Sequence, residues 1–308
     1  MFEKVNPSHP DKVADRISGA IVDHCYAHSE GGWLKSNPRV AVEVLLGHGK
    51  CYVMIETSCT RAELSCNDVD DIVHRIVGDV ETFVTICNQD PELSKNQKDG
   101  IKVGDNGCFR GCAPTYEQKV LTAIAASMYE RWPYDGKYII NRKFWDEDPD
   151  YVSYGVTVCQ SHATRQEIGM LLSAFEKSQF GAKGIFCPID EYTINPLGEW
   201  TGGPDVDCGA TNRKLGSDMG EGVTGGGLHG KDLSKGDVSI NIVCFLKAVQ
   251  SGQTVTACCS IGDEQVTFVY AGGKTETESF RDVVLATVCK YRWSSAFSKP
   301  DCRVLWST

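Results

Sequence analysis

Residues 9–24 read HPDKVADRISGAIVDH, and this stretch predicts an amphipathic helix that starts at Pro10. Proline suits the first helical position because its missing N–H costs nothing there. Apolar side chains then recur at four-residue spacing, at Val13, Ile17, Ile21 and Cys25. One face of this helix is therefore expected to be buried.

His9 and Asp11 stand at the start of that helix, where the dipole is positive and backbone N–H groups have no helical partner. Such an end attracts phosphate. An ordinary cap at His9 and a dipole-stabilising acid at Asp11 would give the same pattern. Both interpretations stay open on this segment alone.

The order helix, strand pair, helix is predicted three times along the chain. The first set is helix 10–28, strands 39–46 and 51–57, and helix 62–79. The second set is helix 114–132, strands 137–144 and 151–160, and helix 163–177. The third set is helix 233–250, strands 254–260 and 265–271, and helix 278–293. The segments left over, 88–113 and 195–232, are long and polar, which is where function concentrates.

This repetition predicts an α+β fold of three αββα subdomains with pseudo-threefold symmetry. The expected divisions are 1–88, a loop segment 89–113, 114–198, and 199–308 with its Gly-rich loops. Each sheet can bury one face under its helices. The other faces would meet each other or a second subunit.

The composition disfavours some classes of ligand and cellular location. The 308 residues carry a formal net charge of −10, which disfavours nucleic acid as a ligand. No apolar run approaches the roughly 20 residues of a membrane span, and the first residues lack a signal core, so a cytoplasmic protein is expected. The 15 cysteines show no paired zinc spacing and are expected to be reduced.

Two Gly-rich loops carry the residues suited to phosphate. GGPDVDCGATNRK (202–214) ends in the adjacent pair Arg213-Lys214. TGGGLHGKDLSKGD (224–237) places Lys231, Lys235 and Asp237 around a helix start. Glycine loop, helix start and lysines together resemble a phosphate cradle, although the Walker A pattern is absent. A solvated surface loop is the alternative.

Carboxylates form a second group of candidate site residues, beside the Gly-rich loops. Glu43 and Glu56 flank the first hairpin and are expected on one face of the sheet. There the pair could bind a monovalent metal or a ligand amine. The alternative is that this face is simply exposed to solvent. Asp105 lies in VGDNG, and Asp135-Gly136-Lys137 precedes a strand. No covalent nucleophile stands out. The residues together indicate a multi-phosphate ligand with Mg²⁺.

In this order, these segments resemble the motifs of the methionine adenosyltransferase (S-adenosylmethionine synthetase) family. HPDK resembles its (S/E)GHPDK signature, VGDNG its GAGDQG, and DGK its DAK. INPLGEWTGGPDVDCGATNRK (194–214) resembles INPTGxFxxGGPxGDxGLTGRK, and GGGLHGKDLSKGD resembles GGGAFSGKDxxKVD. The family's three αββα subdomains also match the predicted repeat.

The resemblance implies that ATP, L-methionine and water give S-adenosylmethionine, phosphate and diphosphate. The thioether sulfur attacks C5′ of ATP and displaces triphosphate, which is then hydrolysed. Because the sulfur has no proton to lose, this step needs no general base. The resemblance also implies two Mg²⁺ per site, K⁺, and a homodimer with shared active sites that can pair into a tetramer.

The same resemblance assigns the site residues. The catalytic residues would be His9, Lys231 and Asp237. ATP would contact His9, Asp135, Lys137, Trp200, Asp207, Arg213, Lys214 and Lys231. Methionine would contact Glu56, Gln89, Asp105, Asp207 and Lys235. Asp11 and Asp237 would bind Mg²⁺, and Glu43 would bind K⁺.

The chain also departs from the family pattern. It is shorter than is usual in the family, mainly towards the C-terminal end, and Ser8 replaces the glycine before His9. Glu199 replaces a basic residue, GGGLHGKD is one residue short, and the segment 89–104 that corresponds to the mobile lid diverges. Two other functions are therefore weighed: a non-catalytic regulatory subunit, and a triphosphate hydrolase that no longer uses methionine.

Overall fold

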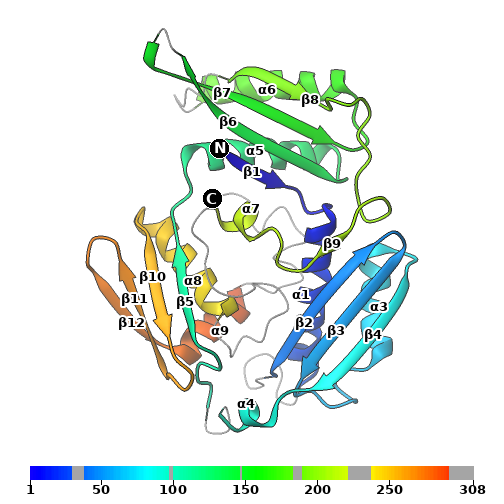
Figure 1. Ribbon diagram of the computed structural model, residues 1–308, viewed down its shortest axis with the longest axis vertical. Helices are drawn as coiled ribbons and strands as arrows, with labels where there is room; N and C mark the ends of the chain where they lie inside the picture. Colours follow the sequence, from blue (N-terminus) through cyan, green and yellow to red (C-terminus); the bar gives the residue numbers. More distant parts are fainter. Residues whose placement is uncertain (30–37, 97–99, 146–147, 183–188, 221–236, 291–308) are drawn as a thin grey trace.

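The computed structural model describes residues 1–29, 38–96, 100–145, 148–182, 189–220 and 237–290. These ranges form three four-stranded sheets, each with helices on one side (Figure 1). The predicted order of helix, hairpin and helix occurs three times, so the α+β prediction is confirmed. No helix in the described ranges combines the length and hydropathy that a bilayer crossing requires.

The first unit contains α1 (Pro10–His28), β2 (Val40–Gly47), β3 (Lys50–Thr57), α3 (Cys66–Val77) and β4 (Glu81–Asn88). Its sheet has the order β4-β3-β2-β9, with β4 parallel to β3. His48 and Gly49 both have positive φ, which makes the two-residue turn of the β2–β3 hairpin. Helix α3 begins four residues later than predicted because Ser65 and Asp68 form a capping box.

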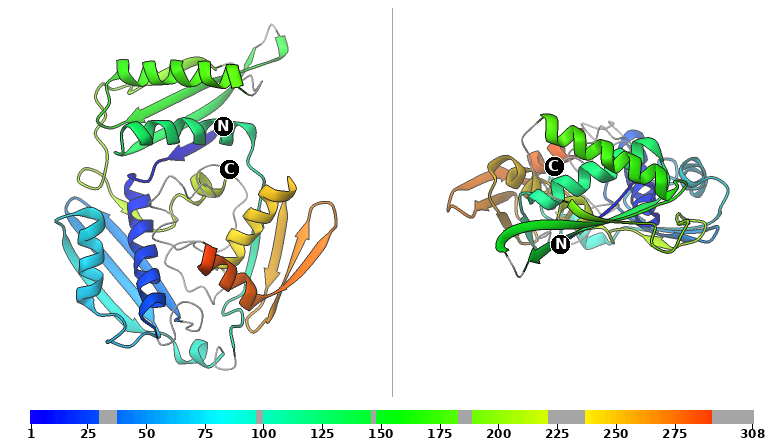
Figure 2. Two further views of the ribbon diagram at one scale, coloured as in Figure 1. Left: turned by 180° about the vertical axis from the view of Figure 1, so that it is seen from behind. Right: turned by 90° about the horizontal axis from the view of Figure 1, so that it is seen from above.

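The second unit contains α5 (Tyr116–Arg131), β6 (Gly136–Trp145), β7 (Asp148–Gln160), α6 (Arg165–Ala182) and β8 (Ile189–Ile194). Strand β1 (Phe2–Val5), from the start of the chain, pairs with β6 and completes the order β1-β6-β7-β8. Helices α5 and α6 lie side by side over this sheet (Figure 2). The pairing of β1 therefore places the start of α1 beside the second sheet.

The third unit contains α8 (Asp237–Ser251), β10 (Val255–Cys259), β11 (Gln265–Tyr270), β12 (Thr275–Ser279) and α9 (Phe280–Lys290). Its sheet has the order β12-β11-β10-β5. Strand β5 (Gly107–Gly111) joins from a distant part of the chain and pairs antiparallel with β10.

The two segments expected to be long loops contain regular structure. Segment 88–113 includes α4 (Pro91–Asn96) and β5, and segment 195–232 includes β9 (Gly209–Ala210) and α7 (Leu215–Met219). These elements are short or Gly-rich, and β5 and β9 form because distant strands supply their hydrogen bonds. The local sequence pattern does not indicate pairing with strands that are distant in sequence.

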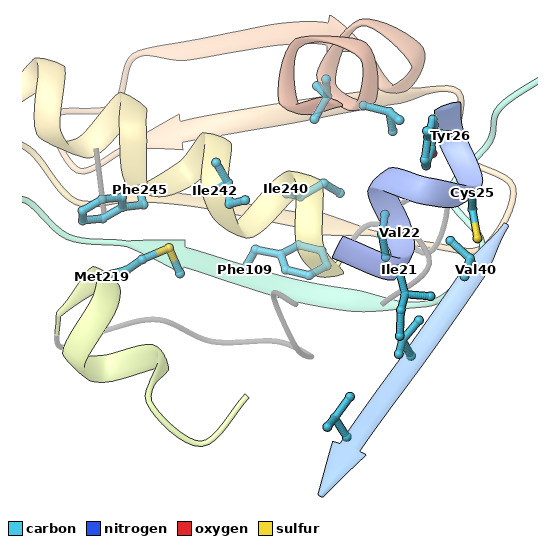
Figure 3. Close-up of a cluster of buried hydrophobic side chains, with 14 of the residues drawn as sticks. Ile21, Val22, Cys25, Tyr26, Val40, Phe109, Met219, Ile240, Ile242 and Phe245 are labelled. Carbon is cyan, nitrogen blue, oxygen red and sulfur yellow. The ribbon is translucent and has the colours of Figure 1, made fainter. Parts of the chain in front are cut away.

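The hydrophobic core has two parts. One cluster joins the first and third units, where Ile21 and Val22 of α1 lie with Ile240 and Ile242 of α8 (Figure 3). The second unit has a separate cluster around Tyr138. The first and third units therefore pack as one body. Three chain segments connect that body to the second unit: β1 to α1, β5 to α5, and β8 to β9.

Candidate active site

The start of α1 is built around a buried histidine. His9 is the N-cap, and its Nδ1 accepts a hydrogen bond from the Asp11 backbone N–H at 3.2 Å. The ring proton therefore lies on Nε2. That atom is buried and has no hydrogen-bond partner among the described residues. The site thus holds a buried N–H donor.

The imidazole of His9 is neutral. Burial is the main cause that lowers its pKa to about 3, and nearby cations lower it further. Those cations are Lys137, Lys214, Lys12 and Arg213. A neutral donor surrounded by positive charge is suited to an anionic oxygen.

Strand β9 crosses the start of α1 at very short range. Asp11 Oδ1 accepts a hydrogen bond from the Ala210 N–H at 2.9 Å and lies 3.5 Å from Arg213 Nη1. A Cβ at Gly209 would lie 2.1 Å from the carbonyl carbon of Pro10. Glycine is therefore required for the 202–214 loop to approach the helix end.

A second carboxylate, one turn further along α1, holds the same loop. Asp15 accepts a hydrogen bond from the Asn212 N–H at 3.0 Å, and Asn212 has a φ of +66°. Lys12 is buried and forms ion pairs with Asp15 and Asp218. Burial alone would lower the pKa of Lys12, but these two carboxylates raise it. Lys12 therefore connects α1 to α7, and Asp15 fixes the backbone before Arg213.

The cations predicted to bind phosphate form their own contacts. Lys137 Nζ lies 3.8 Å from an oxygen of Asp207, and Lys214 Nζ donates to Glu3 Oε1 at 2.7 Å. Arg213 is 59% exposed. Lys137 and Arg213 are loosely paired and can turn towards a ligand at small cost, whereas Lys214 would first have to break its ion pair with Glu3.

Asp135 is a buried carboxyl beside the same loop. Its Oδ2 accepts a hydrogen bond from the Gly203 N–H at 2.8 Å, whereas its Oδ1 is buried without a partner. Burial raises its pKa to about 7. A Cβ at Gly202 would lie 2.4 Å from Asp135 Oδ2 and 2.7 Å from the Trp200 ring, so this glycine brings the indole and the carboxyl together.

Glu43 and Glu56 lie on the same outer face of the first sheet, as predicted. Glu43 is opposite Met54 and Glu56 is opposite Ala41, which makes the two glutamates diagonal neighbours. Thr211 Oγ1 donates to Glu43 Oε2, and this contact ties Glu43 to the loop at the start of α1.

Glu56 and Gln89 lie at the neighbouring ends of β3 and β4. Glu56 Oε1 lies 3.4 Å from the Asp90 N–H, next to Gln89. Gln89 Oε1 accepts hydrogen bonds from Arg39 Nε at 2.7 Å and Ser94 Oγ at 3.3 Å. The two residues assigned to methionine therefore lie at the same end of this sheet, and Glu56 contacts the residue that follows Gln89.

The remaining predicted residues are not joined to these groups by a described contact. Asp105 is exposed on the bend before β5, where its Oδ1 accepts from the Asn106 N–H. Asp237 is the first residue of α8. Lys231 and Lys235 lie outside the described residues.

Sequence reasoning missed three residues that shape the site: Asp15, Thr211 and Arg39. The four-residue spacing of Asp11 and Asp15 places both on one face of α1 and could have indicated that both hold one loop. Thr211 and Arg39 act through contacts between distant segments, which have no local signal.

The donor chemistry fits a hard cation at Asp11. In the described hydrogen bonds Oδ1 of Asp11 accepts from Ala210, and Oδ2 lies 3.7 Å from His9 Nδ1, which carries no proton to donate. A carboxylate oxygen of this kind suits Mg²⁺. No group of three or more His, Cys, Asp or Glu side chains forms a metal cluster within the described ranges, so a metal here would need further ligands from the substrate, water or other parts of the chain.

Comparison with known proteins agrees with the motif resemblance. The family described as "S-adenosylmethionine synthetase, N-terminal domain" matches residues 1–90. The chain is 30% identical to the S-adenosylmethionine synthase of Sulfurovum sp. over 274 residues, which cover 77% of this chain and 69% of the relative. It is 28% identical to that of Acidiphilium cryptum over 305 residues, covering 83% and 73%.

A solved structure shares the fold. It is described as an unusual S-adenosylmethionine synthetase from Campylobacter jejuni, with a TM-score of 0.61 and 20% identity, and the match covers 96% of this chain and 88% of that one. At this identity the likeness concerns the fold, and the sequence relatives carry the family assignment. The chain belongs to the S-adenosylmethionine synthase family, the methionine adenosyltransferases.

Proposed function

We propose that this chain converts ATP, L-methionine and water into S-adenosylmethionine, phosphate and diphosphate. The observation that carries the proposal is the Nε2–H of His9, a neutral, buried donor without a described partner, surrounded by Lys137, Lys214 and Arg213. This arrangement suits an oxygen that gains negative charge as a polyphosphate leaves.

In this mechanism the methionine sulfur attacks C5′ of ATP and triphosphate departs. The neutral thioether carries no proton on sulfur, so alignment of sulfur and C5′ replaces acid–base catalysis. His9 would donate from Nε2 to the oxygen that links C5′ to the leaving triphosphate. Because its pKa is about 3, His9 keeps this donor role across neutral pH.

Four cations would hold the polyphosphate. Arg213 offers a planar fork, and Lys214, Lys137 and Lys231 offer point charges. Asp11 and Asp237 are the residues that we assign to Mg²⁺, which when bound supplies charge neutralisation for the polyphosphate. Asp11 also fixes the loop that carries Arg213, through its bond to Ala210.

The nucleoside would bind beside Asp135. Trp200 would stack on the adenine, because an indole face can stack on a base. The unpartnered Oδ1 of Asp135 is an acceptor for a ribose hydroxyl. Asp207, next to Lys137, would contact both substrates.

Methionine would bind through Glu56, Gln89, Asp105 and Lys235. The carboxylate of Glu56 is suited to the substrate ammonium group, and Gln89, at the same end of the sheet, is held by Arg39. Glu43 on the same sheet face is the residue that we assign to K⁺. These residues account for a methionine requirement that a simple triphosphate hydrolase would lack.

We also propose a homodimer, with a tetramer as a further assembly. The outer face of the first sheet exposes large apolar side chains beside Glu43 and Glu56. They are Leu45, Tyr52, Met54 and Phe83. Contiguous exposed apolar surface of this kind is suited to association with a second copy.

The test uses the purified full chain with ATP, methionine, Mg²⁺ and K⁺, and detects S-adenosylmethionine by mass spectrometry. We expect sulfonium product that depends on methionine, with phosphate and diphosphate in equal amounts. ATP consumption without sulfonium product would point to a triphosphate hydrolase. Absence of any turnover would favour a regulatory subunit, and either result overturns the proposal.

Single substitutions assign the roles. His9→Asn, Asp11→Asn and Lys235→Ala should each abolish turnover while the circular dichroism spectrum stays unchanged. Lys119→Ala, on the exposed face of α5, is the matched control and should keep full activity. A near-normal rate in any of the first three variants would remove that residue from the mechanism.

A further inference from the structure

Two cysteines face each other across neighbouring strands of the third sheet. Cys108 on β5 and Cys258 on β10 are direct partners in the antiparallel register. Their Sγ atoms lie 3.1 Å apart, with Cys258 donating to Cys108. Both side chains are exposed, and no described cysteine is in a disulfide.

Core packing does not account for this pair. Along β10 and β5 the inward positions are buried, including Ala257, Cys259 and Phe109, whereas Cys108 and Cys258 point to the outer face. A small apolar side chain gains little on an exposed face. Their placement together is therefore better explained by thiol chemistry.

The strand geometry suits a disulfide. Directly opposite residues of an antiparallel pair have Cα atoms about 4.5–5.5 Å apart. This lies inside the range of about 4.4–6.8 Å that disulfides span. No backbone movement between strands is needed to bring the sulfurs together.

The hydrogen bond between the two thiols favours one order of attack. The hydrogen bond to Cys108 raises the pKa of Cys258, so Cys258 retains its proton. Cys108 is the acceptor in that hydrogen bond. Cys108 is therefore the first nucleophile.

We propose that Cys108 and Cys258 form a reversible dithiol–disulfide site that exchanges with low-molecular-weight disulfides. The Cys108 thiolate attacks one sulfur of the oxidant, breaks its S–S bond and releases one thiol. Cys258 loses its proton, attacks the Cys108 sulfur of the mixed disulfide and releases the second thiol. The protein is oxidised by two electrons and the small disulfide is reduced to two thiols.

The site is close to a segment with a proposed role in methionine binding. Cys108 follows Asp105 by three residues, and Asn106 accepts a hydrogen bond from the Ile261 N–H at 2.9 Å. A bond between the two cysteines would tie this bend covalently to the end of β10. The thiol chemistry itself is independent of the adenosyltransferase activity.

The test incubates the native full chain with oxidised glutathione, alkylates the remaining thiols and digests it with trypsin without reduction. We expect the peptide VGDNGCFR linked to the peptide that contains Cys258, with a loss of about 2 Da, and reversal by dithiothreitol. Cys108→Ser and Cys258→Ser should abolish the linked peptide and retain one glutathione adduct on the remaining cysteine. Cys66→Ser, which removes an exposed cysteine on α3, is the matched control and should leave the linked peptide unchanged.

Three outcomes would overturn the proposal. In the first, Cys108 and Cys258 of the wild-type chain remain fully open to alkylation after treatment with oxidised glutathione. In the second, the wild-type chain carries glutathione adducts on these cysteines but forms no bond between them. The third is a Cys108–Cys258 bond found only between two chains, which non-reducing electrophoresis would reveal. The wild-type measurement decides the question even if a serine variant folds poorly.

Discussion

Replacing Asp135 by asparagine should make the protein more stable, and the gain should grow with pH. Burial raises the pKa of Asp135 from an ordinary 3.8 to about 7. The folded state therefore keeps a proton that the unfolded state releases, and stability falls as the pH rises between these two values. Asparagine cannot ionise, so it removes this cost.

The size of the effect follows from the two pKa values. The ionisation cost in the wild-type chain is about 2 kcal/mol at pH 5 and about 4 kcal/mol at pH 8. Asparagine keeps an acceptor for the Gly203 N–H, and its amide adds a buried donor whose cost does not depend on pH. The difference between the two pH values, about 2–3 kcal/mol, therefore measures the carboxyl alone.

The assay is urea unfolding of wild type and Asp135→Asn at pH 5 and pH 8, without nucleotide. Asp190→Asn, an exposed position on β8, is the matched control and should change stability by less than about 0.5 kcal/mol at both pH values. Equal stability changes for Asp135→Asn at pH 5 and pH 8 would refute the reasoning. The same variant should bind ATP more weakly, because we assign the carboxyl to the ribose.

Two further substitutions test the packing around the start of α1. Gly209→Ala should lower the free energy of unfolding in urea by about 1–3 kcal/mol, because the new Cβ would lie 2.1 Å from a backbone atom of Pro10. Unchanged stability would show that β9 can move away from α1. Lys12→Met should cost about 3–5 kcal/mol, because it removes the buried cation that pairs with both Asp15 and Asp218. Lys50→Met is the matched control: it removes an exposed ion pair and should lower the free energy of unfolding by less than about 1 kcal/mol. Equal losses of stability in the Lys12 and Lys50 variants would show that burial of the Lys12 ion pairs does not matter.

The repeated elements were predictable from sequence because their signals are local. Helix α1 has its proline at the first position and its apolar spacing, and both ends agree with the prediction. The β2–β3 hairpin has alternating valines and a turn that requires positive φ at His48 and Gly49. Such features are decided within a few residues of chain.

The predicted hairpins supply two strands of each sheet, and the other two were not predicted: β4 and β9, β1 and β8, and β5 and β12. Strands β1, β5 and β9 are two to five residues long, and each pairs with a strand that is distant in sequence. Strand β9 is only Gly209–Ala210, yet it closes the first sheet and places its loop on Asp11. Strand β12 is polar throughout and gives no apolar alternation.

The same distinction applies to the candidate site. The motifs identified His9, Asp11, Asp135 and Arg213 as candidate site residues, because residue type and glycine spacing are enough to recognise such candidates. Their assignment to substrates stays a prediction, as do the domain divisions at residues 88, 113 and 198. The sequence could not predict that Oδ1 of Asp135 is buried without a partner, because burial depends on tertiary packing; Gly202, for example, packs against the other oxygen, Oδ2.

The HPDK segment divides its work between chemistry and folding. His9 and Asp11 face the cations of the candidate site, whereas Lys12 faces inward and joins Asp15 to Asp218. Asp11 and Asp15 then hold consecutive parts of one loop, so the position of Arg213 depends on both. The lysine of this motif is thus required for the structure on which the phosphate site stands. A variant at Lys12 that keeps stability and loses activity would contradict that division.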